Sequence, residues 1–531
     1  MALIDINGLT FGYDGSPDTI FQDVSFQIDS DWRLGLIGRN GCGKTTFLNL
    51  LLGKLEYQGT ISSPLPFEYF PYPVCAAGSS ALEQIRETIA PYRAWETEME
   101  RLLQANTPEA LTAYGEVQEL YNANGGYTID EEIRREASRL RVTPDALDRP
   151  FPTLSSGEKT KLLLAAMFLR KNSFLLIDEP TNHLDLEARE AVADYLKTKK
   201  GFLLVSHDRK ILDSAADHIL SINRKTIEVQ KGNYSSWRAN KERKDQFELA
   251  QNDKLKKEIH RLEDAANRTA GWSDDVEKTK YGSLNAGLKP DRGYLGHKAA
   301  KMMKRSKAAE QRREKAAEEK SQLLQDLELP GELKLHVLTH PKKLLVEAKD
   351  LSISYGERNI VKDFCFTIFQ GERVALRGKN GCGKSSVIKL LLGENIPYTG
   401  LFQKAGNLKI SYIPQDASFL RGSLREYIQQ SGVEESLMKA ILRKLDFSRG
   451  QFDKDMASYS EGQKKKVLLA KSLSEPATLF VWDEPLNFVD ILSQEQIELL
   501  LQKEKPTMLF VEHDAAFCDK IATKFVEFGE E

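Results

Sequence analysis

The sequence predicts an α/β protein made of two tandem, related domains that are joined by an α-helical hairpin. Three observations predict this fold. A segment that begins at Leu34 returns at Val374, and each copy has an apolar, strand-like run followed by a glycine-rich turn. A charged stretch with helical spacing of its apolar residues separates the two copies. With 531 residues, 41% of them hydrophobic, the chain can bury more than one core.

The two halves of the repeat differ in length. LGLIGRNGCGKTTFLNLLLGKLEYQGTI in the first half matches VALRGKNGCGKSSVIKLLLGENIPYTGLF in the second, and the lysines of GK are 340 residues apart. Later matching motifs are only 305 residues apart, so the first half carries 35 extra residues. The apolar spacing of ALEQIRETIAPYRAWETEMERLLQ is helical, which predicts an inserted helical arm within about residues 76–150, or else one longer packing helix. The expected domain limits are 1–237, 238–343 for the hairpin linker, and 344–531.

The glycine-rich turns GRNGCGKT and GKNGCGKS both match GxxxxGK[ST], the pattern of a phosphate-binding loop. Glycines let successive backbone amides turn toward phosphate oxygens at a helix N-terminus, and the lysine neutralises phosphate charge. A glycine turn without a ligand is the alternative, but two copies in register disfavour it. The predicted nucleotide contacts are Gly38, Asn40, Gly41, Gly43, Lys44, Thr45 and Thr46 in the first half, and Gly378, Asn380, Gly381, Gly383, Lys384, Ser385 and Ser386 in the second.

Acidic residues directly follow an apolar strand in each half, in FLLIDEP and LFVWDEP. In a phosphoryl-transfer site the first acid, Asp178 or Asp483, belongs near Mg²⁺, together with the hydroxyl of Thr45 or Ser385. The second acid, Glu179 or Glu484, can polarise the attacking water.

Two histidines, His207 in VSHD and His513 in VEHD, end later apolar strands. A single histidine at a strand end is usually structural. Its return at the matching position favours contact with the γ-phosphate.

TLSSGEKTK and SYSEGQKKK resemble the signature motif of the ATP-binding cassette (ABC) ATPases, so both halves resemble complete cassettes over nearly the whole chain. In that family two cassettes enclose two ATP molecules head to tail, with Mg²⁺. The resemblance therefore implies that Lys44 and Glu179 act with Ser460 and Gly462 of the other half. In the same way, Lys384 and Glu484 would act with Ser155 and Gly157. Tyr13 and Tyr355 match the aromatic residue that stacks on adenine, although each could instead be a strand residue of the core.

The sequence departs from the family pattern at several positions. YIPQ supplies the family's glutamine at Gln415, a predicted contact of ATP and Mg²⁺, whereas YFPY in the first half has Tyr72 there. Leu486 stands where the first half has Thr181, and Phe488 and Val489 stand where it has His183 and Leu184. The two ATP sites are therefore expected to differ.

The overall charge is close to balanced, at −3, but the linker is locally basic. Residues 289–315 hold ten Lys or Arg against three acids, a balance of +7 that favours a phosphate backbone as partner over a solvated helix face. The predicted RNA contacts are Lys298, Lys301, Lys304, Arg305 and Lys307. Apolar runs are too short to cross a bilayer, the N-terminus does not have the pattern of a signal peptide, and the five cysteines are scattered, which together indicate the cytoplasm.

Twin cassettes, an arm in the first, a basic hairpin between them and no membrane domain resemble the ABC-F proteins. Members of that family bind the tRNA exit site of the ribosome and touch the peptidyl-site tRNA with the linker. VEKTKYGS and GHKAAKMMKRSK are most similar to the Lsa-type resistance members, which dislodge lincosamides, pleuromutilins and streptogramin A. The implied partners are the bacterial 70S ribosome, its large-subunit rRNA and the peptidyl-site tRNA, bound by a monomer whose cassettes pair intramolecularly. A housekeeping translation factor and an ATPase subunit of a membrane transporter are the alternatives.

Overall fold

The computed structural model describes residues 2–13, 19–72, 80–105, 107–182, 184–223, 227–247, 249–251, 253–254, 257, 333–356 and 358–528. The chain forms two compact units, one of Met1–Ser235 with Pro330–Glu531 and one of Ser236–Leu329. His183 and the predicted RNA contacts Lys298, Lys301, Lys304, Arg305 and Lys307 lie outside the described residues.

The first half is built on a six-stranded sheet with the order β5-β6-β7-β3-β8-β9. All neighbouring strands are parallel except β9, which runs antiparallel to β8. The strands are β3 (Arg33–Gly38), β5 (Phe67–Phe70), β6 (Phe174–Asp178), β7 (Phe202–Val205), β8 (His218–Ile222) and β9 (Ile227–Lys231). The central strands β6 and β7 are continuous apolar runs because helices cover both faces of a parallel sheet.

A second, antiparallel sheet in this half has the order β2-β1-β4, with β1 (Leu3–Gly12), β2 (Thr19–Asp29) and β4 (Gln58–Ser62). Its apolar residues pack with helix α1 (Lys44–Leu51) and the inner strands into one core. The remaining helices that bear on the site are α7 (Ser156–Leu169), α8 (Leu186–Lys197) and α9 (Arg209–Ala215).

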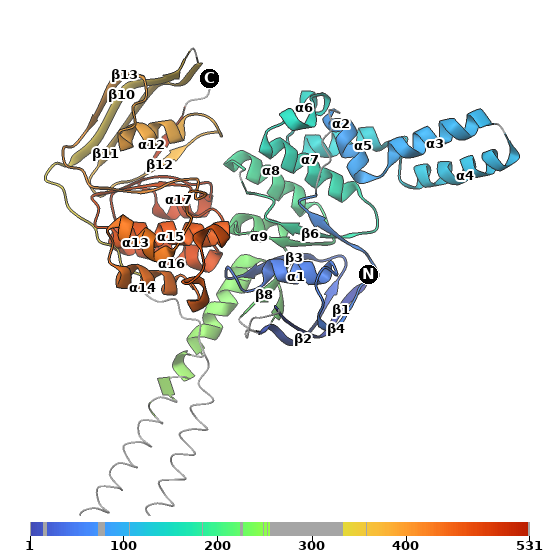
Figure 1. Ribbon diagram of the computed structural model, residues 1–531, viewed down its shortest axis with the longest axis horizontal. Coiled ribbons are helices and arrows are strands. Elements are labelled where there is room, and N and C mark those ends of the chain that lie inside the picture. The colour runs from blue at the N-terminus through green and yellow to red at the C-terminus, as the bar shows by residue number, and fades with distance from the viewer. Residues whose placement is uncertain are drawn as a thin grey trace, which may run out of the picture. The chain divides into compact units, whose positions relative to one another are not determined.

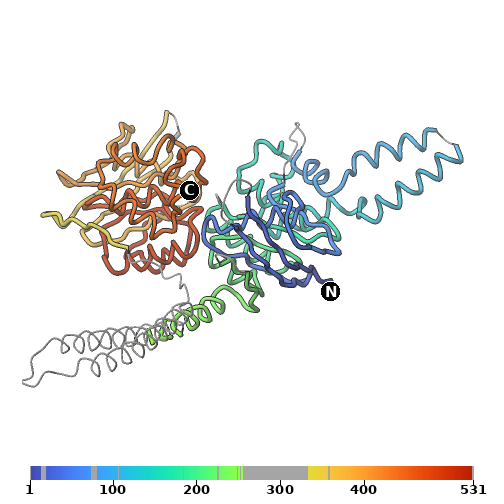
Figure 2. Tube along the Cα trace, turned by 60° about the horizontal axis from the view of Figure 1, so that its bottom comes forward, coloured from blue at the N-terminus to red at the C-terminus, as the bar shows by residue number. Residues whose placement is uncertain are grey.

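Five helices occupy the stretch of the first half in which the arm is expected. They are α2 (Ala81–Ile89), α3 (Tyr92–Ala105), α4 (Pro108–Ala123), α5 (Ile129–Arg139) and α6 (Pro144–Asp148). Figures 1 and 2 show α3 and α4 side by side as an antiparallel hairpin that extends away from the sheet. At its base the Tyr92 and Tyr121 rings meet edge to face, with centroids 5.9 Å apart.

The second half repeats the architecture without this helical insertion. Its five-stranded parallel sheet has the order β14-β15-β16-β12-β17, and its antiparallel sheet has the order β11-β10-β13. The strands are β10 (Leu344–Tyr355), β11 (Arg358–Phe369), β12 (Arg373–Arg377), β13 (Tyr398–Lys404), β14 (Ile410–Ile413), β15 (Leu479–Asp483), β16 (Met508–Val511) and β17 (Lys524–Glu527). The helices are α12 (Lys384–Leu392), α13 (Leu424–Ser431), α14 (Glu435–Lys444), α15 (Glu461–Ser474), α16 (Ile491–Glu504) and α17 (Ala515–Ile521).

This architecture confirms the predicted fold class, two tandem α/β domains of the same type. It also places the motifs at one edge of each sheet, because β3, β6 and β7, and likewise β12, β15 and β16, all end at the carboxyl edge of a parallel sheet. Loops at that edge are the usual location of a ligand site in such folds. Within the described ranges, no helix has the length and apolar character needed to span a membrane.

Candidate nucleotide-binding sites

Each glycine-rich loop connects a parallel strand to a helix and wraps around its own lysine. Lys44 Nζ donates to the carbonyl of Gly38 at 2.8 Å, and Lys384 Nζ donates to that of Gly378 at 2.7 Å. The residue before each helix, Gly43 or Gly383, has φ of 101°, and a Cβ on Gly43 would lie 2.6 Å from the side chain of Ile20. The glycines are thus required for a loop that turns its amides toward an anion at a helix N-terminus.

A pocket of about 710 Å³, called the first pocket below, surrounds the loop of the first half. From the first half it is lined by Tyr13, Ile20, Asn40, Gly41, Gly43, Lys44, Thr45, Thr46, Tyr69, Pro71, Asp178, Glu179, Asn182, Val205 and His207, and from the second half by Lys454, Ser460, Glu461, Gly462, Gln463 and Phe488. It therefore brings together almost all of the residues that the sequence predicts for this site. Its volume lies in the range of small-molecule sites.

The two halves meet closely at the first pocket. Asn40 Nδ2 donates to the carbonyl of Phe488 at 2.8 Å, and a Cβ on Gly462 would lie 2.4 Å from both of these groups. Ser460 is the N-cap of α15 and forms a capping box with Gln463, so the start of this helix faces the pocket. Ser460 and Gly462 of the signature motif in the second half thus complete a site whose phosphate loop belongs to the first half.

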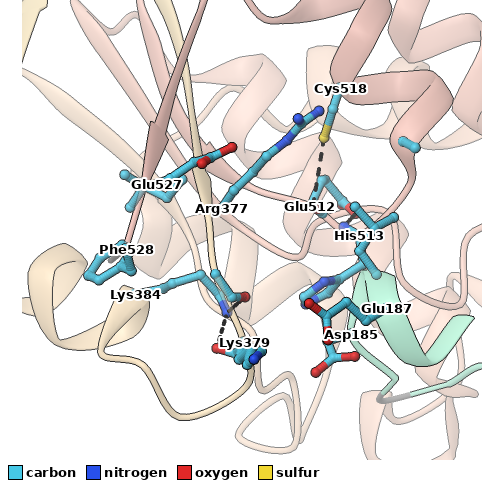
Figure 3. Close-up of a pocket in the computed structure, with 14 residues that line it drawn as sticks. Asp185, Glu187, Arg377, Lys379, Lys384, Glu512, His513, Cys518, Glu527 and Phe528 are labelled. Carbon is cyan, nitrogen blue, oxygen red and sulfur yellow. Dashed lines mark hydrogen bonds between the residues drawn. The ribbon is translucent and has the colours of Figure 1, made fainter. Parts of the chain in front are cut away.

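A second pocket of about 450 Å³ surrounds Lys384 and is drawn in Figure 3. Figure 3 shows Asp185 and Glu187, from the ribbon of the first half, facing Lys379 and Lys384. Neither Ser155 nor Gly157 lines this pocket. Ser155 caps α7 with Glu158 in the same way that Ser460 caps α15, but its pairing with Lys384 stays a prediction. Of the predicted residues, Gly378, Lys384 and His513 line the second pocket. The remaining ones do not: Asn380, Gly381 and Gly383 are in the phosphate loop, Ser385 and Ser386 are in the first turn of α12, and Gln415 follows β14.

The glutamates that follow the two strands have the same backbone and different partners. Glu179 and Glu484 both have φ of 48°, a left-handed conformation that costs free energy in a residue with a side chain. Glu484 accepts from Asn487 Nδ2 at 2.5 Å, and its other oxygen lies 3.3 Å from His513 Nε2. Glu179 Oε2 accepts a long bond of 3.4 Å from the His207 amide, and its Oε1 lies 3.3 Å from His207 Nε2 without forming a hydrogen bond, so the difference from Glu484 is the absence of an amide donor such as Asn487.

The different surroundings shift the pKa values of Glu179 and Glu484 in opposite directions. Burial raises the pKa of Glu179 to about 8, with the carboxylate of Asp178 adding to the shift. Burial acts in the same direction on Glu484, but hydrogen bonds from His513 and Gln415 outweigh it, and the pKa of Glu484 is lowered. Burial and the Lys44 ammonium lower the pKa of His207 to about 3, so this ring is neutral. In the ligand-free protein at neutral pH, the second half presents a carboxylate and the first half presents a carboxylic acid.

The predicted magnesium ligands also have different neighbours. Ser385 Oγ donates to Asp483 Oδ2 at 3.1 Å, so a hydroxyl and a carboxylate oxygen, both ligands that suit Mg²⁺, lie side by side. In the first half Asp178 Oδ2 instead accepts from the Tyr69 hydroxyl at 3.0 Å. Tyr69 was not singled out from the sequence, although YFPY aligned with YIPQ could have drawn attention to it. Burial raises the pKa of both aspartates, a shift that a bound cation would oppose.

Tyr72 and Gln415 occupy matching positions and do different things. The side chain of Gln415 hydrogen-bonds to Glu484. Tyr72 does not line the first pocket, and the Arg170 guanidinium lies over its ring, 4.6 Å from the centroid. The first half thus lacks a side chain that holds its glutamate from this position.

The two aromatic residues predicted at adenine are both on the surface. Tyr13 is 48% exposed and Tyr355 is 45% exposed, so neither is a residue of the core. Tyr13 OH lies 3.0 Å from Thr46 Oγ1, and Tyr355 OH lies 3.4 Å from Ser386 Oγ. Each ring is therefore held beside the first turn of the helix that follows the phosphate loop.

A buried charge cluster, which is not part of the lining of either pocket, joins the halves. Arg209 at the start of α9 forms an ion pair with Glu498 of α16, and its Nη2 donates to Asp514 Oδ2 at 3.0 Å. All three side chains are at most 7% exposed. The corresponding residue of the second half is Ala515, so the pair has no counterpart by sequence symmetry.

A search against protein families matches residues 21–182 and 361–487, more than half of the chain, to the ABC transporter model. The chain belongs to the ABC transporter family. This membership makes it an ATP-binding protein with two ATPase domains, as both phosphate loops and both acidic motifs require. Each matched segment contains one loop and one DEP motif, whereas the first pocket combines residues from both.

Curated relatives of this ABC transporter family member cover almost its whole length. It is 27% identical over 549 residues to the putative ATP-binding protein YdiF of Bacillus subtilis, a match of 100% of the chain and 80% of the relative. It is 28% identical over 515 residues to the ribosome protection protein VmlR of the same organism, covering 96% of the chain and 84% of the relative. A crystal structure of the archaeal ribosome recycling factor aABCE1, in complex with the ribosomal stalk protein aP1, aligns with a TM-score of 0.58 at 17% identity. It covers 99% of the chain and 88% of that structure, and the likeness shows the fold alone.

Proposed function

We propose that this ATPase is a cytoplasmic ribosome-binding protein of the ABC-F type, which protects the peptidyl transferase centre from antibiotics. The observation that carries the proposal is the alignment with the ribosome protection protein VmlR, which runs through both ATPase domains and the linker between them over 96% of the chain. The basic block of the linker and the helical hairpin α3–α4 are the additions that an ATP-binding domain alone does not need.

The two pockets supply the motor. ATP and Mg²⁺ would bind at Lys44 and Lys384, with Tyr13 or Tyr355 against the adenine and Thr45, Asp178, Ser385, Asp483 and Gln415 around the metal. Glu179 and Glu484 would polarise the attacking water, and His207 and His513 would contact the γ-phosphate. Because Ser460 and Gly462 already line the first pocket, binding there would hold the two halves together, and hydrolysis would release them.

The linker supplies the working end. Lys298, Lys301, Lys304, Arg305 and Lys307 would neutralise backbone phosphates of peptidyl-site tRNA and large-subunit rRNA after entry through the exit site. The loop between Trp272 and Tyr294 would then reach the peptidyl transferase centre, where lincosamides, pleuromutilins and streptogramin A bind. The Lsa-like blocks VEKTKYGS and GHKAAKMMKRSK support this drug class.

Ribosome binding is tested by cosedimentation with 70S ribosomes in ATP and in ADP. The Glu179→Gln/Glu484→Gln protein should remain on ribosomes in ATP, since it binds nucleotide without hydrolysing it. A fourfold Ala variant at Lys298, Lys301, Lys304 and Arg305 should bind more weakly and with a flatter salt dependence, because each phosphate contact releases a counterion. Its ATPase rate without ribosomes should not change. Cosedimentation that is equal in ATP and ADP for the hydrolysis-deficient protein would contradict the proposal.

Antibiotic protection needs a separate experiment. Growth in a lincosamide or a pleuromutilin is measured with the wild type, the fourfold Ala variant, and a protein with a shortened connection between Trp272 and Tyr294. The shortened protein should still cosediment but should not protect. Ribosome binding without drug protection by the wild type would favour a housekeeping translation factor, and sedimentation with membranes would favour a transporter subunit.

A further inference from the structure

Glu512 is a buried acid that the ATPase chemistry above does not use. It follows β16 directly, precedes His513, and is 7% exposed in the second pocket, where Figure 3 shows it near Cys518. The corresponding residue of the first half is Ser206. Within the described part of the chain, Glu512 forms no ion pair, although the charges of Lys465 and Arg189 lie near enough to interact with it.

Both oxygens of Glu512 accept hydrogen bonds from backbone amides. Oε1 accepts from Leu486 N at 2.8 Å, and Oε2 accepts from His513 N at 3.1 Å. The side chain therefore ties the end of β16 to the segment Leu486–Val489, called the DEP loop below. Ser206 cannot do this, because its shorter side chain accepts from Asp208 N at 3.1 Å instead.

The DEP loop contacts residues of both halves. Asn487 donates to Glu484 in the second half and lies 3.4 Å from the Arg189 guanidinium of the first half. The carbonyl of Phe488 accepts from Asn40 of the first phosphate loop, and Phe488 itself has φ of 64°, a strained value for an aromatic residue. A strained segment keeps one conformation only where its surroundings fix it.

We propose that Glu512 is a positioning residue of the ATPase, which anchors the DEP loop and thereby sets Glu484 against His513 and Phe488 against Asn40. The first half has Thr181 and Ser206 at the corresponding positions, whereas the second half has an apolar Leu486 and an acid there. The anchor places Asn487 where its amide donates to Glu484. The inference rests on ATP binding and hydrolysis by this chain and not on the ribosome.

The test uses the full-length protein without ribosomes, in a Glu179→Gln background so that turnover reports on Glu484. Glu512→Ser removes the acceptor for the Leu486 amide, and a buried donor without a partner should lower kcat about tenfold. The KM for ATP should change less than about twofold, because no group that binds ATP is removed. Ser206→Ala, the matched change in the first half, should leave kcat within about twofold.

Two further variants separate anchoring from charge. Burial raises the pKa of Glu512 to about 8, so Gln approximates its protonation state at neutral pH and keeps an oxygen for the Leu486 amide. Glu512→Gln should therefore retain most of kcat, which also gives a result if Glu512→Ser does not fold. In a Glu484→Gln background, Glu512→Ser should have no further effect on the residual rate, because it acts through Glu484.

Three results would overturn the proposal: equal losses for Ser and Gln, a change confined to KM, or an undiminished loss in the Glu484→Gln background. Each is independent of ribosome binding, so the proposed function on the ribosome can fail while this inference stands, and the reverse.

Discussion

Arg209 offers a direct test of how the two halves are held together. Its guanidinium is buried between Glu498 and Asp514 of the other half, and these acids raise its pKa even though burial alone would lower it. Replacing Arg209 by Ala removes the cation and leaves two buried acids. Glu498 keeps Lys520, whose Nζ lies 3.1 Å away, whereas Asp514 keeps only the amide of Phe517 that it caps.

The magnitude follows from distance and burial. At the observed 3.0 Å, one ion pair in a medium of effective dielectric constant 20 is worth about 5.5 kcal/mol before desolvation is counted. Removing one partner of a buried pair costs roughly 3–5 kcal/mol in proteins, mostly because the remaining charge is buried without compensation. Since Lys520 still serves Glu498, we expect about 3 kcal/mol. Lys at position 209 keeps the charge but not the two-acid geometry and should cost about 1–2 kcal/mol.

Urea unfolding of the full chain measures this, through the free energy of the first transition, together with the ATPase rate. A double-mutant cycle with Glu498→Gln isolates the pair, and its coupling energy should exceed about 1 kcal/mol. Lys210→Ala is the matched control, since that neighbour pairs with the exposed Glu190 at 2.7 Å and should change stability by less than about 1 kcal/mol. Equal stability of the Arg209→Ala protein and the wild type would refute the reasoning.

Three further predictions concern the glutamates. The Glu179→Gln/Glu484→Gln protein should bind a fluorescent ATP analogue as the wild type does, while phosphate release falls by about 100-fold or more; turnover within twofold of wild type would exclude both as general bases. The single variants should differ in residual turnover, because Asn487 and Gln415 hydrogen-bond to Glu484, whereas Glu179 is contacted by His207; equal rates would mean that this difference in partners does not affect hydrolysis. Finally, the pKa of Glu179 rises from 4.5 to about 8 on folding, so between these two pH values the native state retains a proton that the unfolded state loses. This residue therefore makes the ligand-free protein less stable as the pH rises from 4.5 to about 8. Glu179→Gln should abolish this loss and be more stable than wild type by roughly 2–4 kcal/mol at pH 8, with no difference below pH 4.5, as measured by unfolding at several pH values.

The sequence predicted the fold and most of the first pocket because phosphate loops, acidic motifs and signature helices are local patterns. Gly43, Lys44 and Ser460 are each recognisable from a few neighbouring residues, and a repeat makes chance agreement improbable. The partners of these residues were not predictable in the same way. Tyr69 on Asp178 and Glu512 on Leu486 are contacts between segments more than twenty residues apart, and no spacing rule specifies them.

The positions at which the sequence departs from the family pattern predicted that the two sites differ, but not which contacts make them different. Tyr72 in place of glutamine predicted that the sites differ, but not that Arg170 would lie over the ring. Phe488 in place of a histidine gave no indication of its role, because the group that contacts Asn40 is the backbone carbonyl, which every residue has. Backbone contacts and strained conformations depend on tertiary structure and are therefore the least visible part of a site.

The difference between the pockets extends to residues that belong to no motif. Arg39 of the first phosphate loop lies 3.6 Å from Asp446 of the other half, whereas the residue that corresponds to Asp446 in the first half is Arg141, which pairs with Asp194 at 3.3 Å. The second phosphate loop has Lys379 at the position of Arg39. By sequence symmetry, the position of Asp446 opposite Arg39 is taken by Arg141 opposite Lys379.

Charged residues near the start of the two signature helices also have different partners in the two halves. Arg149 forms an ion pair with Glu158 of α7, the signature helix of the same half. Its counterpart Lys454 lines the first pocket, and the counterpart of Glu158 is the uncharged Gln463. Opposite charges thus meet at Arg39 and Asp446 beside the first phosphate loop, and the additional cation of Lys454 lines its pocket. Attraction across one pocket therefore does not imply attraction across the other, and the unequal sites follow from ordinary surface charges as much as from the catalytic motifs.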